Sequence, residues 1–588
     1  MKQFFKMMFA SALGVFVATV LLFIFSIFSL ISIVSSFSSS PTYIPKDNTV
    51  FKIKLSGNLV DNATANPLDV FIGNTESTLS LTDILSSIQK AEKNEQIKGI
   101  YLESGILSTG SASLTAIRKA LGNFKKSGKF VIAYADNYTQ GNYYLCSIAD
   151  KVFMNPQGSL GLTGIASQTM FYKALLNKVG VEMQVFKVGT YKGAVEPFML
   201  DKLSDANREQ IQSYINSIWN IMTEGIAQER QITVDEVDEF ANKGLAFSDP
   251  KKSVEYRLID ELKYKSEAEE YIKELAGQTG KKLEVADIDK MKNILTLEKE
   301  KEDQIAILYA EGEIKPYKPS TPYETEQYIS EKLADELIKL KNDEKVKAVV
   351  LRVNSPGGSA FVSEQIWKEV VELKKVKPIV VSMGDIAASG GYYISCAANK
   401  IIAEPNTLTG SIGIFGLFPN ATGLFDKLDV TADIVKTNKF ADLGDLTRPM
   451  TTDEKTLIQH YINKGYDTFL SRCAEGRSLP KDSINQIGQG RVWTGQQALD
   501  NGLIDQLGGI DEAIKEAALL ANVTDYSINN VSGISDFLND FIEKQLGNVK
   551  MNIVKSILGN DYEYFKTLQE IRSVSGVQAR LPYDMKPL

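Results

Sequence analysis

The chain has 588 residues, of which 44% are hydrophobic and 23% are charged, and its formal net charge is −8. This length exceeds what one hydrophobic core usually supports and favours two to four domains of ordinary globular composition. The mild acidic excess argues against a nucleic-acid-binding protein, because such proteins usually carry a basic surplus. The three cysteines contain no CxxC pair and cannot form a disulfide framework.

A single histidine, His460, narrows the possible chemistry. A zinc site of the HExxH type needs two histidines, so the sequence predicts no metal site of that kind. A Ser-His-Asp or Cys-His arrangement would have to use His460, which lies in an amphipathic helical pattern with no nucleophile motif nearby. We therefore interpret His460 as structural and expect the base of any hydrolytic reaction to be another residue type.

The first 46 residues are predicted to hold a membrane anchor. Residues 9–34 are almost wholly apolar, which exceeds the about 20 residues that a membrane-spanning helix needs. The alternative is a cleaved signal peptide, whose apolar region usually spans about 7–15 residues. Lys2 and Lys6 precede the run and no charge follows it before Lys46. The positive-inside rule therefore predicts a cytoplasmic N-terminus, with everything after residue 45 on the outer side.

An internal repeat follows, with an offset of 249 residues. Residues 141–165, GNYYLCSIADKVFMNPQGSLGLTGI, align without gaps with residues 390–414, GGYYISCAANKIIAEPNTLTGSIGI. The same register pairs KGIYLESG with KAVVLRVN upstream, and VFKVGTYK with IVKTNKFA downstream. The sequence therefore predicts two homologous domains at residues 47–297 and 304–530, a charged linker at 298–303, and a helical tail at 531–588.

Each copy alternates short apolar runs with amphipathic helical patterns, which is typical of the α/β class with strands buried on both faces. In the second copy the pattern predicts strands at residues 305–314, 348–353 and 378–383, and helices over about residues 325–340 and 364–373 and after Ser389. In the tail, residues 534–558 have helical apolar spacing, which favours a packing helix over a membrane-binding one.

Two turns in the second copy are candidates for chemistry. Ser389 falls where the chain enters a predicted helix, so it lies beside free backbone N–H groups that suit an oxyanion. The alternative interpretation is an ordinary N-cap serine. The preceding strand ends in NSPGGS, where Gly357 or Gly358 has the backbone freedom to donate to an oxyanion at Ser389. That motif is equally consistent with a simple strand-to-helix turn.

The two copies differ at these positions. The first copy has Gln140 in place of Ser389, whereas it has Lys192, in GTYKGAVEPF, where the second copy has Ala441. One copy thus supplies a candidate nucleophile and the other a candidate base, because desolvation can lower the pKa of a lysine enough for it to act as a base. On spacing alone, Lys192 is better interpreted as a surface lysine or an ion-pair partner of Glu196.

Four motifs together, NSPGGS, MGDIAASGGYYI, LTGSIGIFG and YKGAVEPF, closely resemble the signal peptide peptidase A family in its long, duplicated, membrane-anchored form. The resemblance covers nearly the whole chain after the anchor. It implies two tandem Clp/crotonase-like domains and a serine protease with a Ser-Lys dyad. The implied site residues are Ser389 as nucleophile, Lys192 as general base, Ser411 as the residue that orients Lys192, and the N–H groups of Gly357, Gly358 and Gly390 as oxyanion hole.

The same resemblance implies a setting for the enzyme. It implies a homo-oligomer, expected to be a tetramer, without a cofactor. It also implies a single-pass protein of the bacterial inner membrane whose catalytic domains lie on the outer, periplasmic side. The implied partners are the membrane and peptide substrates, namely signal peptides left after secretion, and no nucleic acid.

Three other functions fit the sequence less well. GNFKKSGKF (122–130) looks like a phosphate-binding loop, but it has five residues between the glycines and Phe130 in place of Ser or Thr, which excludes it. An acyl-CoA enzyme of the crotonase type would not need the pair of Ser389 and Lys192. A membrane scaffold with two degenerate protease-like domains would not need to keep Ser411 or the glycine turn.

Overall fold

The computed structural model describes residues 42–63, 78–295, 301–317, 328–531 and 576–580, together with isolated positions before residue 22. The predicted anchor therefore lies almost entirely outside the described residues, and so does the predicted helix over 534–558. No helix within these ranges has the length and apolar character required to cross a membrane.

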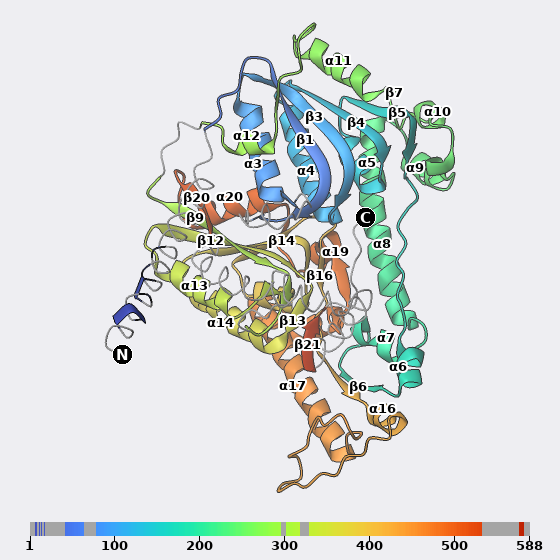
Figure 1. Cartoon of the computed structure of the whole chain (residues 1–588), viewed down its shortest axis with the longest axis vertical. Coiled ribbons are helices and arrows are strands. Elements are labelled where there is room, and N and C mark those ends of the chain that lie inside the picture. Colours follow the sequence, from blue (N-terminus) through green and yellow to red (C-terminus); the bar gives the residue numbers. More distant parts are fainter. Residues whose placement is uncertain are drawn as a thin grey trace.

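The first copy is built on a parallel sheet whose strand order is β2-β1-β3-β4-β5-β7, with β8 beside β1 (Figure 1). The core strands alternate with helices along the chain because each apolar run is followed by an amphipathic segment. The strands are β1 (Thr49–Val60), β2 (Thr78–Ser80), β3 (Ile97–Ser108), β4 (Phe130–Tyr138), β5 (Lys151–Leu160), β7 (Glu261–Leu262) and β8 (Val285–Ala286). The main helices are α3 (Leu81–Lys93), α4 (Ser111–Lys125), α5 (Gln140–Cys146), α8 (Asp205–Arg230), α9 (Val234–Ala241), α11 (Lys265–Leu275) and α12 (Ile288–Lys292).

The second copy has a corresponding sheet in the order β18-β16-β14-β12-β9-β20, with β15 joining β14 to β19. Its strands are β9 (Gln304–Glu311), β12 (Val346–Ser355), β14 (Ile379–Ala388), β15 (Lys400–Ala403), β16 (Leu408–Gly410), β18 (Val492–Thr494), β19 (Gln506–Leu507) and β20 (Ser527–Val531). Its main helices are α13 (Lys332–Asn342), α14 (Ala360–Lys374), α15 (Gly390–Ser395), α17 (Thr452–Arg477), α19 (Gly495–Asp500) and α20 (Ile510–Leu520).

The repeat predicted from the sequence is confirmed by the elements. Strands β3 and β4 of the first copy begin 249 residues before β12 and β14, and α4 and α14 keep the same offset. One detail of the prediction is wrong: the helix expected from about residue 325 begins at Lys332, and Tyr328–Ile329 form the strand β11 instead. The apolar positions of that segment pair in a sheet, which local helical spacing cannot reveal.

A third sheet joins the two copies, in the order β11-β10-β13-β21-β17-β6. Strand β6 (Glu182–Lys187) belongs to the first copy and pairs antiparallel with β17 (Phe415–Asn420) of the second, so that Lys187 lies opposite Phe415. The other members are β10 (Glu313–Ile314), β13 (Gly357–Ser359) and β21 (Gly576–Arg580). The first copy therefore extends an arm into the second.

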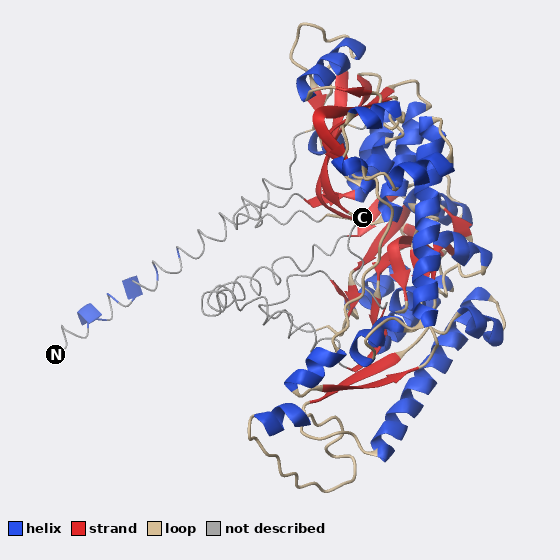
Figure 2. Ribbon diagram, turned by 90° about the vertical axis from the view of Figure 1, so that its right-hand side faces the viewer, coloured by secondary structure: helices blue, strands red, loops and turns tan. Residues whose placement is uncertain are grey.

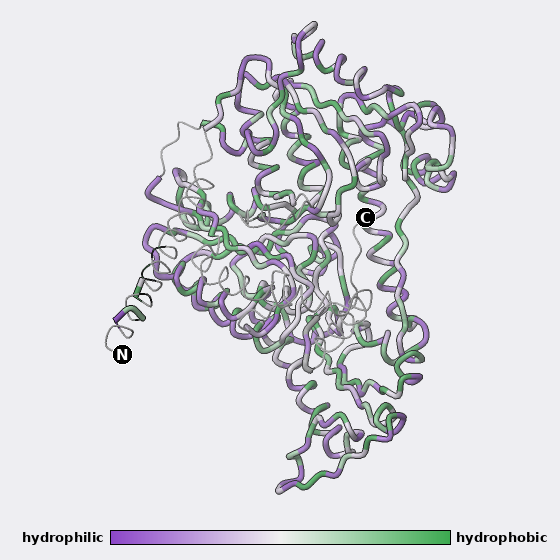
Figure 3. Tube along the Cα trace, viewed as in Figure 1, coloured by the Kyte–Doolittle hydropathy of each residue, from purple (hydrophilic) through white to green (hydrophobic). Residues whose placement is uncertain are grey.

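The two copies also share packed and polar contacts. One continuous hydrophobic core contains residues of both copies, for example Leu114 and Val492. Figure 3 shows apolar positions concentrated in the strands and hydrophilic positions on the outer helices. A buried ion pair joins Asp61 of the first copy to Arg352 of the second at 2.7 Å. The long helix α8 runs beside both sheets (Figure 2), so the relative position of the copies is fixed over a long contact.

Candidate active site

Three of the predicted site residues meet where the copies join. The Nζ atom of Lys192 lies 2.8 Å from Ser389 Oγ, 3.1 Å from Ser411 Oγ and 3.2 Å from the Ser411 carbonyl oxygen. All three residues have no exposed surface. Lys192 comes from the arm of the first copy, whereas Ser389 and Ser411 follow β14 and β16 of the second, so neither copy alone contains the cluster.

The arm is attached to the second copy along its whole length up to Lys192. After the β6–β17 ladder, the N–H of Val188 donates to the carbonyl of Ile414 at 3.2 Å. The N–H of Tyr191 donates to the carbonyl of Gln489 at 2.9 Å. Backbone hydrogen bonds therefore hold the chain in place as far as Tyr191, the residue before Lys192, and they do so independently of side-chain packing.

Two glycines make room for the lysine. A Cβ atom on Gly490 would lie 2.7 Å from Lys192 Cα, and one on Gly413 would lie 3.2 Å from Lys192 Cδ. Gly490 also has a φ of 82°, which only glycine adopts readily. Gly413 belongs to the GSIG motif, but sequence analysis missed Gly490, because its role depends on contact with a segment about 300 residues earlier.

The backbone at Ser389 is unusual. Its φ of 56° and ψ of −112° are rare for a residue with a side chain, and such conformations cost about 1–3 kcal/mol. Ser389 occupies the N-cap position of α15, yet its side chain accepts no helix N–H and contacts Lys192 instead. Ser389 is therefore the N-cap residue by position, but its side chain does not cap the helix. Ser411 also has a positive φ, of 50°.

Burial favours the neutral form of Lys192. The loss of hydration holds the pKa of its amine well below the ordinary value for lysine. The predicted alternative partner, Glu196, faces elsewhere: its carboxylate accepts hydrogen bonds from the N–H and hydroxyl of Ser204 and from Asn207. Among the residues that the structure describes, no charged partner offsets the effect of burial on the pKa of Lys192. A neutral amine beside a serine hydroxyl is the arrangement that general-base chemistry needs.

The predicted oxyanion glycines surround Ser389, but they are not equivalent. The N–H of Gly357 already donates to Ser355 Oγ at 3.1 Å. Gly358 has a φ of 154°, and a Cβ there would lie 2.0 Å from the Ile314 carbonyl oxygen. Gly390 is the first residue of α15, so no preceding helical turn accepts its N–H. Gly390 is therefore a better candidate donor than Gly357, and the tight packing of Gly358 shows that only a glycine fits there.

The corresponding place in the first copy has no such chemistry. The Oε1 atom of Gln140 accepts hydrogen bonds from the N–H groups of Thr163 and Gly164, at 3.0 and 2.9 Å. The glutamine side chain thus engages two backbone N–H groups that lie beside it. Gln140 and Leu162, the counterparts of Ser389 and Ser411, both lack the positive φ of those serines.

Two exclusions from the sequence can be compared with the fold. His460 lies on an exposed face of α17, whereas Ser389 and Lys192 have no exposed surface. Across the described ranges, no cluster of three or more His, Cys, Asp or Glu side chains has the geometry to hold a metal ion.

The sequence model of Peptidase family S49 matches the chain twice, at residues 123–279 and 371–524. The chain belongs to peptidase family S49. A Clp protease model also matches residues 291–409. The two S49 matches begin 248 residues apart, close to the offset of 249 between the copies, so the peptidase domain is present twice in this S49 protein.

Curated relatives agree with this assignment. Protease 4 of Haemophilus influenzae is 36% identical over 485 residues, covering 79% of this chain and 78% of that protein. Protease 4 of Salmonella typhi is 35% identical over 486 residues, covering 81% and 78%. The chloroplastic serine protease SPPA of Arabidopsis thaliana is 33% identical over 514 residues, covering 86% and 74%. The S49 protein is therefore a serine protease, and neither the acyl-CoA enzyme nor the non-catalytic scaffold describes it.

The buried amine gives a stability prediction. Lys192→Met should raise the melting temperature at pH 7, because the parent must hold an amine neutral that is protonated in the unfolded chain. This gain should shrink as the pH rises towards about 10.4, where the unfolded lysine also loses its proton. Thermal melts at a series of pH values check this, with the exposed Lys202→Met as control. A gain that is the same at every pH would contradict the assignment of a neutral Lys192.

Proposed function

We propose that this serine protease cleaves hydrophobic peptides, such as released signal peptides, with Ser389 as nucleophile and Lys192 as general base. The observation that carries the proposal is the 2.8 Å contact between Ser389 Oγ and the desolvated amine of Lys192. The substrate class rests on the resemblance of the four motifs to the signal peptide peptidase A family.

The proposed reaction has two halves. Neutral Lys192 takes the proton of Ser389 as Oγ attacks the peptide carbonyl carbon, and the N–H groups of Gly358 and Gly390 stabilise the oxyanion. The ammonium group then gives that proton to the leaving amine, which leaves an acyl-enzyme ester on Ser389. Lys192 next removes a proton from a water molecule, whose oxygen attacks the ester carbonyl carbon. The ammonium group then returns that proton to Ser389 Oγ as the ester C–O bond breaks, which releases the second product as a carboxylic acid and restores the dyad. The hydroxyl and carbonyl of Ser411 hold the amine in place throughout.

Loss of either member of the dyad should abolish hydrolysis. Ser389→Ala and Lys192→Ala should each reduce kcat/KM for a chromogenic peptide by about 10⁴-fold or more, because nucleophile and base act as a unit. Circular dichroism and size-exclusion chromatography should show folded, normally assembled protein. Substantial activity in either variant would refute the dyad.

The same assay should separate lysine from histidine as base. Activity should rise with pH along one limb, because a base that must be neutral is removed by protonation at low pH, and burial lowers the pKa of Lys192. His460→Gln is the matched control and should leave this limb unchanged. A limb that disappears with His460 would mean that the base has been misassigned.

We also propose that the chain is a single-pass protein of the bacterial inner membrane, with its catalytic domains on the periplasmic side. The apolar run at residues 9–34, preceded by Lys2 and Lys6, supports this topology. A reporter fused after Leu588 should become active only when exported, and alkaline phosphatase and green fluorescent protein fusions together test it. Activity of the cytoplasmic reporter alone would refute the topology.

For the partner, we propose a closed homo-oligomer, for which the family resemblance suggests a tetramer, held by the same strand pairing that joins the two copies. The repeat offset maps β6 onto residues 431–436 and β17 onto residues 166–171. Both segments lie outside helices and strands, and both are mostly exposed. Each therefore carries backbone groups that a second chain can pair with, as β6 and β17 do within the chain.

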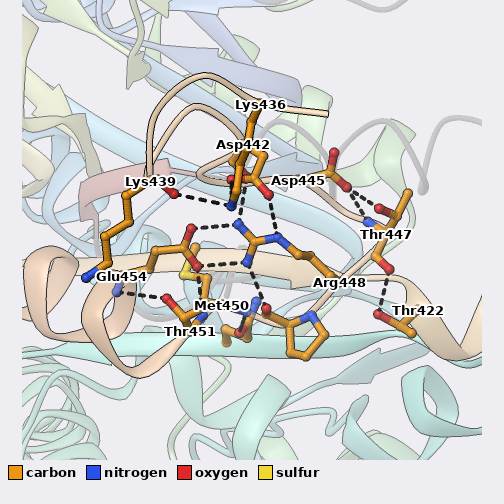
Figure 4. Close-up of polar contacts among 12 residues, drawn as sticks. Thr422, Lys436, Lys439, Asp442, Asp445, Thr447, Arg448, Met450, Thr451 and Glu454 are labelled. Carbon is orange, nitrogen blue, oxygen red and sulfur yellow. Dashed lines mark hydrogen bonds and ion pairs between the residues drawn. The ribbon is translucent and has the colours of Figure 1, made fainter. Parts of the chain in front are cut away.

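The loop before α17, which carries residues 431–436, exposes several apolar side chains among charged ones. Val435 is 98% exposed, and Met170 on the opposite segment is 59% exposed. Figure 3 shows further apolar positions along this loop at the lowest part of the molecule. Arg448 holds the base of this loop through ion pairs with Asp442 at 2.8 Å and Glu454 at 2.6 Å (Figure 4). An exposed apolar segment held in one shape is suited to a subunit contact.

The register of this contact follows from the repeat. Leu417 pairs with Val185 within the chain, so Gln168 of one chain should lie opposite Ile434 of the next. The double variant Gln168→Cys with Ile434→Cys should form disulfides between chains on mild oxidation, since paired strands bring Cα atoms to about 4.5–5.5 Å. The native cysteines are buried and do not compete. The control is Gln168→Cys with Val430→Cys, which lies four residues out of register and should form no such disulfide. If Gln168→Cys with Ile434→Cys runs only as single chains on a non-reducing denaturing gel, the contact is refuted.

A further inference from the structure

The chain just after Lys192 is fastened to the start of α8. Glu196 lies four residues beyond the lysine and is buried. Its carboxylate accepts hydrogen bonds from the N–H and the hydroxyl of Ser204 and from the side-chain amide of Asn207. Ser204 is the N-cap residue of α8, so the carboxylate also lies at the positive end of the helix dipole. Glu196 therefore anchors the segment after the lysine to this helix.

The chain just before Lys192 is fastened to the same helix by Gln210, which is fully buried. The Nε2 atom of Gln210 donates to the carbonyl oxygen of Tyr191 at 2.8 Å and to Oδ1 of Asn207. Its Oε1 atom accepts the N–H of Val492 at 3.0 Å. A backbone carbonyl can only accept and a backbone N–H can only donate, so these partners fix the orientation of the side-chain amide.

Through Val492, Gln210 reaches the segment of the second copy that holds Ser411. Val492 begins β18, which pairs antiparallel with β16, the strand that ends just before Ser411. The carbonyl of its neighbour Arg491 accepts the N–H of Ser411 at 2.7 Å. Ser411 in turn contacts the amine of Lys192. One buried amide therefore connects the residue before the lysine with the segment that contacts its amine.

We propose that Ser204, Asn207 and Gln210 form a clamp on α8 that positions the amine of Lys192 against Ser389. The clamp rests on the proposed function, because it matters for catalysis only if Lys192 is the general base. The three side chains follow one another at intervals of three residues, so each lies beside the next on the helix surface. They are positioning residues, since they act through Lys192. Such precision matters because a misplacement of about 1 Å can cost roughly 10²-fold in rate.

Loss of the Gln210 amide tests the clamp. Gln210→Met keeps the length of the side chain and removes its hydrogen bonds, whereas Gln212→Met makes the same change at an exposed position of α8. Gln210→Met should lower kcat for a chromogenic peptide by about 10–100-fold and leave KM unchanged, because it displaces the base and not the substrate. The pH limb should also move to higher pH, since an amine that reaches water regains a higher pKa.

A purely structural role for Gln210 has a different signature. It would reduce the amount of folded, active protein without moving the pH limb. Gln212→Met should behave as the parent in both respects. An unchanged kcat in Gln210→Met, or a lower kcat with the limb in its parental place, would overturn the proposal.

A second pair of variants perturbs the other end of the clamp more gently. Ser204→Ala removes the hydroxyl that caps α8 and donates to Glu196, whereas Thr233→Ala removes the hydroxyl that caps α9. Both variants lose a helix cap and should lose thermal stability to a similar extent. Only Ser204→Ala should lower kcat, by about five-fold, and shift the pH limb upwards. Equal kinetic effects in the two variants would overturn the clamp.

A stability measurement separates the clamp from the dyad. Lys192→Met is expected to raise the melting temperature at pH 7, because it removes a buried neutral amine. In the Gln210→Met background this gain should shrink, because the amine is no longer held away from water. The same gain in both backgrounds would overturn the clamp. Activity retained by Lys192→Ala would instead refute the assignment of the base, since these melting temperatures do not depend on catalysis.

Discussion

The pairing of β6 with β17 is the interaction on which the site depends, because it carries a lysine of one copy into the interior of the other. Protonation of an amine buried in this way is unfavourable, since burial removes the water that stabilises the charge. Backbone hydrogen bonds hold Val188 and Tyr191 in place, so the side chain of Lys192 is directed towards Ser389. Position and charge state thus follow from the same contact between the copies.

The two copies show what chemistry demands of the backbone. Ser389 and Ser411 have positive φ angles, whereas their counterparts Gln140 and Leu162 do not. The side chain of Gln140 instead satisfies the N–H groups of its neighbours, as an ordinary structural residue does. Local strain at functional residues persists only where the surrounding packing holds it, and the continuous core between the copies provides that packing. The copy without the candidate nucleophile also lacks these positive φ angles.

Part of this architecture could be predicted from the sequence. The repeat is visible because paired elements such as α4 and α14 keep one offset, and helical or alternating apolar spacing is a local property. The contact between Ser389 and Lys192 is not local; spacing alone favoured a surface lysine, and only the family resemblance brought the two residues together. The glycine at Gly490 and the tail strand β21 could not be predicted, because each is defined by a segment distant in the chain that packs against it. The start of the helix expected from about residue 325 is placed too early for a similar reason: Tyr328 pairs in the sheet, and the helix begins at Lys332.

We infer that each active site takes Lys192 and Ser389 from the same chain, through the contact between its own two copies. Co-expression of a Ser389→Ala chain with a Lys192→Ala chain, each carrying a different affinity tag, tests this claim most directly. Mixed oligomers recovered through both tags should be inactive, because every site lacks one member of the pair. Recovery of a substantial fraction of parental activity would show that lysine and serine come from different chains, and it would contradict the arrangement described here.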